Sequence, residues 1–171
     1  LFFANQIHKQ LLADGKKSLL LGMNHYQCFP KAKHLLLFTS TYGLGTAPSN
    51  ATQFETKLMA YPQQQSINFS VLGFGSKAYP DFCAYAYAID QLLGRQVWAS
   101  RLIDLHTVND KSVDELISWV HHWSEHTNIA LASAPAIYSS KVAGLKKFKV
   151  ITRSTVSESN STFTLLLKPL G

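Results

Sequence analysis

Two segments decide the fold: TSTYGLGTAPSN at residues 39–50 and GFGSKAYPD at residues 73–81. Each combines closely spaced glycines with one tyrosine and follows a predicted strand, at 35–39 and at 66–72. The apolar run at 35–39 does not alternate apolar with polar residues, which is typical of a strand that is covered on both faces. Each loop then leads into a helical period of apolar residues. The two segments therefore predict a parallel sheet with helices on both sides.

The same alternation continues outward from these segments. Helical periods are predicted at 1–13, 51–58, 82–93 and 113–120, and further strands at 18–23 and 97–105. Buried strands that alternate with amphipathic helices predict an α/β fold built on a doubly wound parallel sheet. The ligand site of such a sheet lies beyond the carboxyl ends of its strands, where the two glycine loops are expected.

Length and composition restrict the class of protein. The chain has 171 residues, of which 46% are hydrophobic and 15% charged, so it is expected to hold one full domain and part of another. Cys28 and Cys83 have no Cys-x-x-Cys spacing, which favours a reducing, cytoplasmic compartment. The net charge of +6 comes from scattered lysines, which disfavours nucleic acid as a partner. No apolar run is long enough to predict a membrane span.

The C-terminal third of the chain changes in character. Residues 1–125 are predicted to form the first domain, and residues 126–144, rich in alanine, serine and proline, are predicted to be a linker. Residues 148–154 and 162–168 are expected to be strands that flank a turn at 157–161. A two-stranded hairpin is only marginally stable by itself. Residues 145–171 are therefore expected to begin a second domain.

The motifs Ser40-Thr41-Tyr42-Gly43-x-Gly45 and Gly73-x-Gly75-x-Lys77-x-Tyr79 resemble a known pair of loops. They are similar to the isoalloxazine-binding loops of the flavodoxin-like FMN domain in NADPH-dependent diflavin reductases. That family includes the flavoprotein subunit of sulfite reductase and the microsomal cytochrome reductases. The similarity covers residues 1–124 and resumes at 146–169, which resemble the opening hairpin of the family's FAD-binding barrel.

The resemblance implies a site. Tyr42 and Tyr79 would flank the flavin ring on opposite faces, and backbone groups of the two loops would meet its polar edge. The cofactor-binding residues so implied are Ser40, Thr41, Tyr42, Gly43, Gly45, Phe74, Gly75, Ser76, Tyr79 and Asp81. No catalytic residue is predicted, because no serine or cysteine nucleophile has an evident partner. No metal ligand is predicted either, because His122 and His126 are interpreted as an exposed helix end rather than a metal pair.

The resemblance also implies a function. The chain would be the FMN-binding electron-transfer module of an NADPH-dependent oxidoreductase, taking electrons from an FAD/NADPH reductase domain in the same polypeptide. It would pass them singly to a haem or metal-centre acceptor. A membrane tether outside these residues is compatible with the sequence. The alternatives are a free flavodoxin-type electron shuttle and a flavodoxin-like docking domain that has lost its flavin.

Three features depart from the family pattern. Flavodoxin-like sheets have the strand order 2-1-3-4-5, and this sequence starts at the first helix, so the central strand and the loop that holds the FMN phosphate are missing. We therefore expect the polypeptide to continue upstream, and we expect residues 1–171 alone to bind little FMN. Acidic residues are lacking around the first loop, which disfavours a basic soluble acceptor. The acidic residues of loop 104–110 do not fit the family pattern, so that loop is left out of the predicted site.

Overall fold

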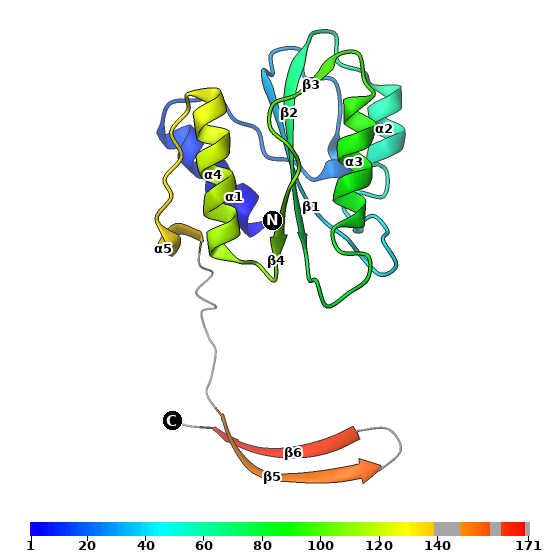
Figure 1. The fold of residues 1–171 in the computed structure, drawn as a ribbon, viewed down its shortest axis with the longest axis vertical. Helices are drawn as coiled ribbons and strands as arrows, with labels where there is room; N and C mark the ends of the chain where they lie inside the picture. The colour runs from blue at the N-terminus through cyan, green and yellow to red at the C-terminus, as the bar shows by residue number, and fades with distance from the viewer. Residues whose placement is uncertain (139–147, 158–161, 170–171) are drawn as a thin grey trace. The chain divides into compact units, whose positions relative to one another are not determined.

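The computed structural model describes residues 1–138, 148–157 and 162–169. The chain divides into two compact units, Leu1–Ser139 and Ser140–Gly171. The first unit alternates helices and strands along the chain (Figure 1). Its elements are α1 (Phe2–Ala13), the 3-10 helix η1 (Met23–His25), β1 (His34–Ser40), α2 (Phe54–Ala60), β2 (Ile67–Gly75), α3 (Ala84–Gly94), β3 (Ala99–Arg101), β4 (His106–Asn109), α4 (Val113–Thr127) and α5 (Pro135–Tyr138).

The sheet of the first unit is parallel. β1 pairs with β2 along its whole length, from His34 opposite Asn68 to Ser40 opposite Phe74. The other edge of β2 pairs with β3 in its first half and with β4 in its second half. Of the strand predicted at 97–105, only 99–101 forms, as β3, and a separate strand, β4, begins beyond it at His106, because the chain leaves the sheet between Arg101 and His106.

Helices cover both faces of this sheet, as Figure 1 shows in an edge-on view. α2 and α3 pack on one face, where Phe54, Leu58 and Ile89 are fully buried against Phe69 and Val71. α1, α4 and α5 pack on the other face around buried side chains that include Ile7, Leu72, Leu116, Trp119, Trp123 and Tyr138. The predicted α/β fold with a doubly wound parallel sheet is confirmed.

Two segments of the first unit differ from the prediction. The strand expected at 18–23 does not form: residues 18–22 pair with no strand of the described chain, and η1 begins at Met23. Residues 126–138, which lie within the predicted linker, pack onto the first unit instead of spanning between units. Leu131 and Tyr138 are buried in its core, and the Tyr138 hydroxyl donates to the Ala132 carbonyl. These apolar contacts explain why the division between the units falls only after residue 139.

The described part of the second unit is a two-stranded antiparallel sheet. β5 (Phe148–Ser157) pairs with β6 (Thr162–Pro169), with register shifts between Val150 and Thr152 and between Thr155 and Ser157. The predicted hairpin strands are confirmed. Most of the turn predicted at 157–161 lies outside the described residues. Among the described residues, no helix is long and apolar enough to cross a membrane.

Candidate functional site

Three loops meet at the carboxyl end of the sheet. The register places Ser40 opposite Phe74, and it places Gly75 opposite Asn109. The segments that follow β1, β2 and β4 therefore start side by side, and together they form the edge at which parallel α/β sheets bind ligands.

The first loop is a tight turn closed by its own backbone. The N–H groups of Tyr42 and Thr46 each donate to the other residue's carbonyl at 2.9 Å, and the Thr46 hydroxyl donates to the Tyr42 carbonyl at 2.8 Å. Gly43 (φ +51°) and Gly45 (φ +82°) lie in the left-handed region, which residues with side chains rarely adopt. A Cβ atom at Gly43 would have no neighbour within 4 Å, so the turn faces open space there.

This turn presents unused hydrogen-bond donors. The N–H groups of Gly43, Leu44 and Gly45 donate to no other part of the described chain. Three successive free N–H groups beside an open space can bind the polar edge of a ligand that carries oxygen or nitrogen acceptors.

The second loop lies against the first. A Cβ atom at Gly45 would lie 3.5 Å from the Ala84 Cβ and 3.7 Å from the Asp81 Cβ. The loop is folded by two turns, in which Tyr79 N–H donates to the Ser76 carbonyl and Ala84 N–H donates to the Asp81 carbonyl, both at 3.1 Å. Gly45 thus faces the second loop and the start of α3 with room for about one methyl group between them.

Each of these two loops exposes one aromatic ring. Tyr42 is 73% exposed and Tyr79 is 70% exposed, whereas Tyr26, Tyr85 and Tyr138 are buried. Large exposed rings on a turn gain contact area when a planar ligand stacks on them. The exposure of Tyr42 and Tyr79 is therefore the feature of this edge that best suits an aromatic ligand.

The start of α3 supports both loops. A Cβ atom at Gly73 would lie only 2.6 Å from the Ala86 Cβ, so only glycine lets the helix approach β2 this closely.

Cys83 precedes α3 with a left-handed φ of 55°, and burial raises the pKa of its thiol to about 11, which keeps it protonated. Tyr85 N–H donates to the Thr41 hydroxyl at 3.1 Å. Thr41, a predicted site residue, thereby connects the first loop to α3.

The third loop contains residues that the sequence analysis missed. Asn109 Oδ1 accepts a hydrogen bond from Lys77 N–H at 2.8 Å, and Asp110 N–H donates to the Gly75 carbonyl at 2.8 Å. The Glu115 carboxylate in turn accepts from Asn109 N–H at 2.5 Å. Asp110 and Lys111 are left-handed, with φ of 47° and 60°. The signal in the sequence that could have identified this loop is the asparagine and aspartate at the end of a strand, because these two residue types tolerate left-handed turns.

The remaining predicted residues occupy the same edge. Ser40 is the exposed last residue of β1, Gly75 ends β2, and the Ser76 hydroxyl accepts from Ala78 N–H at 3.4 Å. The partly buried Phe74 ring stacks on the Phe3 ring of α1, with centroids 5.2 Å apart, so this side chain packs on the first unit's core rather than standing free at the edge. His122 and His126 lie apart from this edge on α4, and His126 Nδ1 lies 2.8 Å from the His122 carbonyl oxygen.

Comparisons with known proteins agree with this geometry. The family model described as Flavodoxin matches residues 3–123. Flavodoxin 1 from Bacillus cereus superposes with a TM-score of 0.58 at 15% identity, covering 72% of this chain and 87% of that one. A cysteine-to-serine mutant of flavodoxin from Pseudomonas aeruginosa gives a TM-score of 0.59 at 18% identity with the same coverage. At these identities the superpositions establish a common fold.

The chain is also similar to short stretches of much longer curated proteins. The inducible nitric oxide synthase of Gallus gallus is 38% identical over 79 residues, which are 44% of this chain and 7% of that protein. The human inducible nitric oxide synthase is 34% identical over 104 residues, which are 60% of this chain and 9% of that protein. The chain thus spans less than a tenth of the length of these two relatives.

Proposed function

Because the chain belongs to the flavodoxin family, we propose that its first unit binds FMN at the three-loop edge and passes single electrons as one module of a larger oxidoreductase. The predicted flavodoxin-like family is confirmed by the family match over residues 3–123, and membership of this family supports FMN as the cofactor. The electron donor and acceptor belong to the proposal.

The residues at the edge fit a flavin. The exposed rings of Tyr42 and Tyr79 suit stacking against a planar heterocycle, and the free N–H groups of Gly43, Leu44 and Gly45 suit its polar edge. The open space beside Gly43 leaves room for the ring to approach the backbone. When bound, FMN supplies the redox chemistry, and the protein orients the ring and sets the polarity around it.

One observation carries this proposal: two strongly exposed tyrosines lie on neighbouring loops that are held together. Tyr85 N–H donates to the Thr41 hydroxyl, and Asn109 Oδ1 accepts from Lys77 N–H. The loop backbone that carries the two rings is therefore held before a ligand arrives, which lowers the ordering cost of binding.

The wider assembly is proposed from the relatives and from the resemblance of the loops. Nitric oxide synthases are much longer than this chain, in keeping with a module inside a reductase. We assign residues 1–125, together with residues 126–138 that pack on them, to the FMN domain, and residues 145–171 to the opening hairpin of an FAD-binding barrel. Downstream FAD and NADPH sites would supply electrons, and a haem or metal centre would receive them. The two unpaired thiols of Cys28 and Cys83 suit a reducing, cytoplasmic compartment.

The two alternative functions, a free electron shuttle and a docking domain without flavin, each leave a feature of the chain unexplained. A free electron shuttle needs no hairpin such as β5 and β6. A docking domain without flavin has no need for two exposed tyrosines on glycine loops. The reductase module therefore accounts for more of the chain than either alternative.

The experiment is an FMN titration of the full polypeptide that contains these residues, followed by flavin fluorescence. Tyr79→Ala should raise the dissociation constant for FMN by about 5- to 150-fold, which corresponds to a stacking contribution of about 1–3 kcal/mol. Tyr61→Ala is the matched control, because Tyr61 is also exposed but lies at the end of α2. Equal affinity of the two variants would exclude Tyr79 from the site.

A second measurement separates the module from the shuttle. Addition of NADPH alone should bleach the flavin absorbance of the full polypeptide, because a diflavin reductase carries its own hydride-accepting domain. Failure of NADPH to reduce a polypeptide that binds FMN would favour the shuttle. A polypeptide that takes up no flavin would favour the docking domain.

A further inference from the structure

The fold gathers basic residues that are scattered along the sequence. The parallel strands β1, β2 and β3 start at one end of the sheet, which is at the top of the first unit in Figure 1. The helices run back against the strands and end there. Four segments therefore lie at this end, 14–18, 29–33, 61–66 and 94–98. We call their exposed surface, with the adjoining end of α2, the amino face.

Hydrogen bonds at the start of β2 fix two of these segments relative to each other. Asn68 N–H donates to the Lys33 carbonyl at 2.9 Å. Ile67 N–H donates to the Trp98 carbonyl at the same distance. Lys33 and segment 94–98 therefore flank the first residues of β2 on its two sides.

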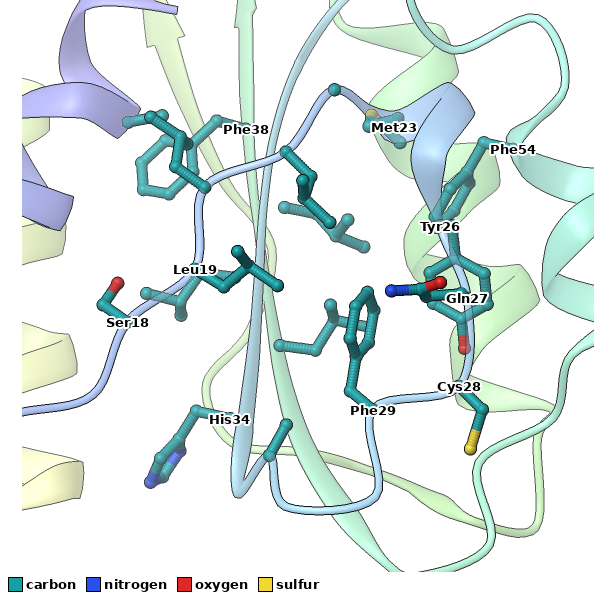
Figure 2. A pocket seen from close by; sticks show the side chains of 18 of the residues that line it. Ser18, Leu19, Met23, Tyr26, Gln27, Cys28, Phe29, His34, Phe38 and Phe54 are labelled. Atoms are coloured by element: carbon teal, nitrogen blue, oxygen red, sulfur yellow. The ribbon is translucent and has the colours of Figure 1, made fainter.

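The end of α1 lies near the start of β1. Lys17 and Lys31 line the same pocket of about 550 Å³. Figure 2 shows this pocket with His34 at one end and Met23 and Phe38 at the other. Lys17 follows the end of α1 and Lys31 precedes β1, so both lysines belong to the end marked by His34.

The amino face is positively charged. Its segments hold one acidic residue, Asp14, whose carboxylate lies 3.6 Å from the Lys16 ammonium nitrogen. By contrast, the loops of the carboxyl edge, 41–53, 76–83 and 110–112, together hold two basic and two acidic residues. The excess positive charge in the loops is therefore at the end away from the candidate site. The basic residues of the amino face are all exposed, and they are Lys16, Lys17, Lys31, Lys33 and Arg95.

Apolar side chains project from the same face. Val97 is fully exposed, Met59 is 63% exposed and Tyr61 is 51% exposed. The Gln96 side-chain amide lies 3.8 Å from the Met59 sulfur, which places the end of α2 beside segment 94–98. Cations that surround exposed apolar groups and a tyrosine suit an interface that is apolar beneath a negatively charged layer.

We propose that the amino face binds the surface of a membrane that contains anionic lipids. The basic residues would contact the charged headgroups, and Val97, Met59 and Tyr61 would enter the interfacial layer. A protein partner fits less well, because lysine, which supplies four of the five cations, is depleted in protein–protein interfaces. In this orientation the carboxyl edge points away from the membrane, so the proposed flavin site stays open to electron-transfer partners.

The test is sedimentation of the full polypeptide with lipid vesicles. Vesicles of phosphatidylcholine mixed with phosphatidylserine should bind it at least about tenfold more tightly than vesicles of phosphatidylcholine alone. Salt at about 0.5 M should remove most of this difference, because it screens charges that are exposed to solvent.

Charge-reversal variants locate the binding surface. Lys17→Glu combined with Lys33→Glu should weaken binding to the anionic vesicles by at least about 25-fold, since each lysine near such a surface contributes about fivefold. Lys149→Glu combined with Lys168→Glu is the matched control. These two exposed lysines face each other across β5 and β6, and the pair changes the net charge by the same amount. The control should leave binding within about twofold.

A third variant tests the apolar contribution. Val97→Ser keeps the charge of the amino face and removes its most exposed apolar side chain. It should weaken binding to the anionic vesicles by about threefold or more, because a valine that enters the interface loses contact with water. Unchanged binding would show that Val97 stays outside the lipid.

Three results would overturn the proposal. They are equal binding to the two kinds of vesicle, equal losses in the two double variants, and binding to polyglutamate but to neither vesicle. The last result would assign the amino face to an acidic protein. None of these measurements uses flavin, so their outcome is independent of FMN binding.

Discussion

Gly73→Ala tests the close packing of α3 on β2 that positions the second loop. The added Cβ would lie 2.6 Å from the Ala86 Cβ and 3.3 Å from the Cys83 Cβ, whereas ordinary contacts lie at 3.4–4 Å. Both neighbours are fully buried and the Ala86 methyl group has no rotamer to change, so the helix and strand must move apart. Overpacking of this kind costs about 1–3 kcal/mol of unfolding free energy.

The assay is urea and thermal unfolding of the first unit. For a protein of this size, each kcal/mol lost lowers the melting temperature by about 2–4 °C. Gly22→Ala is the control, because its Cβ would lie 3.6 Å from the nearest atom and its φ of −69° suits alanine. That variant should change the stability by less than about 1 kcal/mol.

A double-mutant cycle isolates the contact. Ala86→Gly alone should cost about 1 kcal/mol, because glycine in a helix loses conformational entropy. Combined with Gly73→Ala, it removes the 2.6 Å clash, so the double variant should be more stable than the sum of the single effects predicts by about 1–3 kcal/mol. Additive effects would refute the argument that the Cβ contact between residues 73 and 86 sets the helix position.

Three further predictions concern the loops and the packing around them. Asn109→Ala should lower the unfolding free energy by about 0.5–1.5 kcal/mol and speed exchange of the Lys77 amide, and unchanged exchange would contradict the hydrogen bond between them. Burial raises the pKa of Cys83 from its ordinary value near 9 to about 11, so the folded state holds the thiol proton more tightly than the unfolded state. The contribution of the Cys83 thiol to the unfolding free energy is therefore present in full below pH 9, and the unfolding free energy falls by up to about 3 kcal/mol as the pH rises through 11. Cys83→Ala should flatten that decline when denaturation is measured at a series of pH values. Arg101 donates to the Asp90 carboxylate at 2.7 and 3.1 Å, so Arg101→Ala should cost about 1–3 kcal/mol and Arg101→Lys should recover only part of it; full recovery would show that the paired geometry is unimportant.

Several features of the fold could be predicted from local patterns. The apolar runs at 35–39 and 66–72 became β1 and β2, and the helical periods became α1, α2, α3 and α4. The prediction failed where a strand needs a partner. Residues 18–23 are apolar enough for a strand, but strands form only by pairing, and the described chain offers this segment none.

The candidate site shows the same division. The glycine and tyrosine spacing identified the first two loops, because the left-handed turn at Gly43 and Gly45 requires a residue type that is visible in the sequence. The glycines of the second loop, in contrast, are required by the close approach of α3. Asn109 was missed because its side chain accepts a hydrogen bond from Lys77 N–H, and Lys77 is 32 residues earlier in the chain. Only the pairing of β2 with β4 brings the two together.

Local patterns in the sequence were thus enough to predict the parallel sheet, its four main helices and the two glycine loops at its carboxyl edge, since these depend on backbone preferences and hydrophobic periods of nearby residues. The tertiary structure decided how close α3 lies to β2, which residues clamp the loops, and at which end of the sheet the exposed lysines gather. These properties depend on contacts between residues far apart in the chain, and such contacts leave no local periodicity.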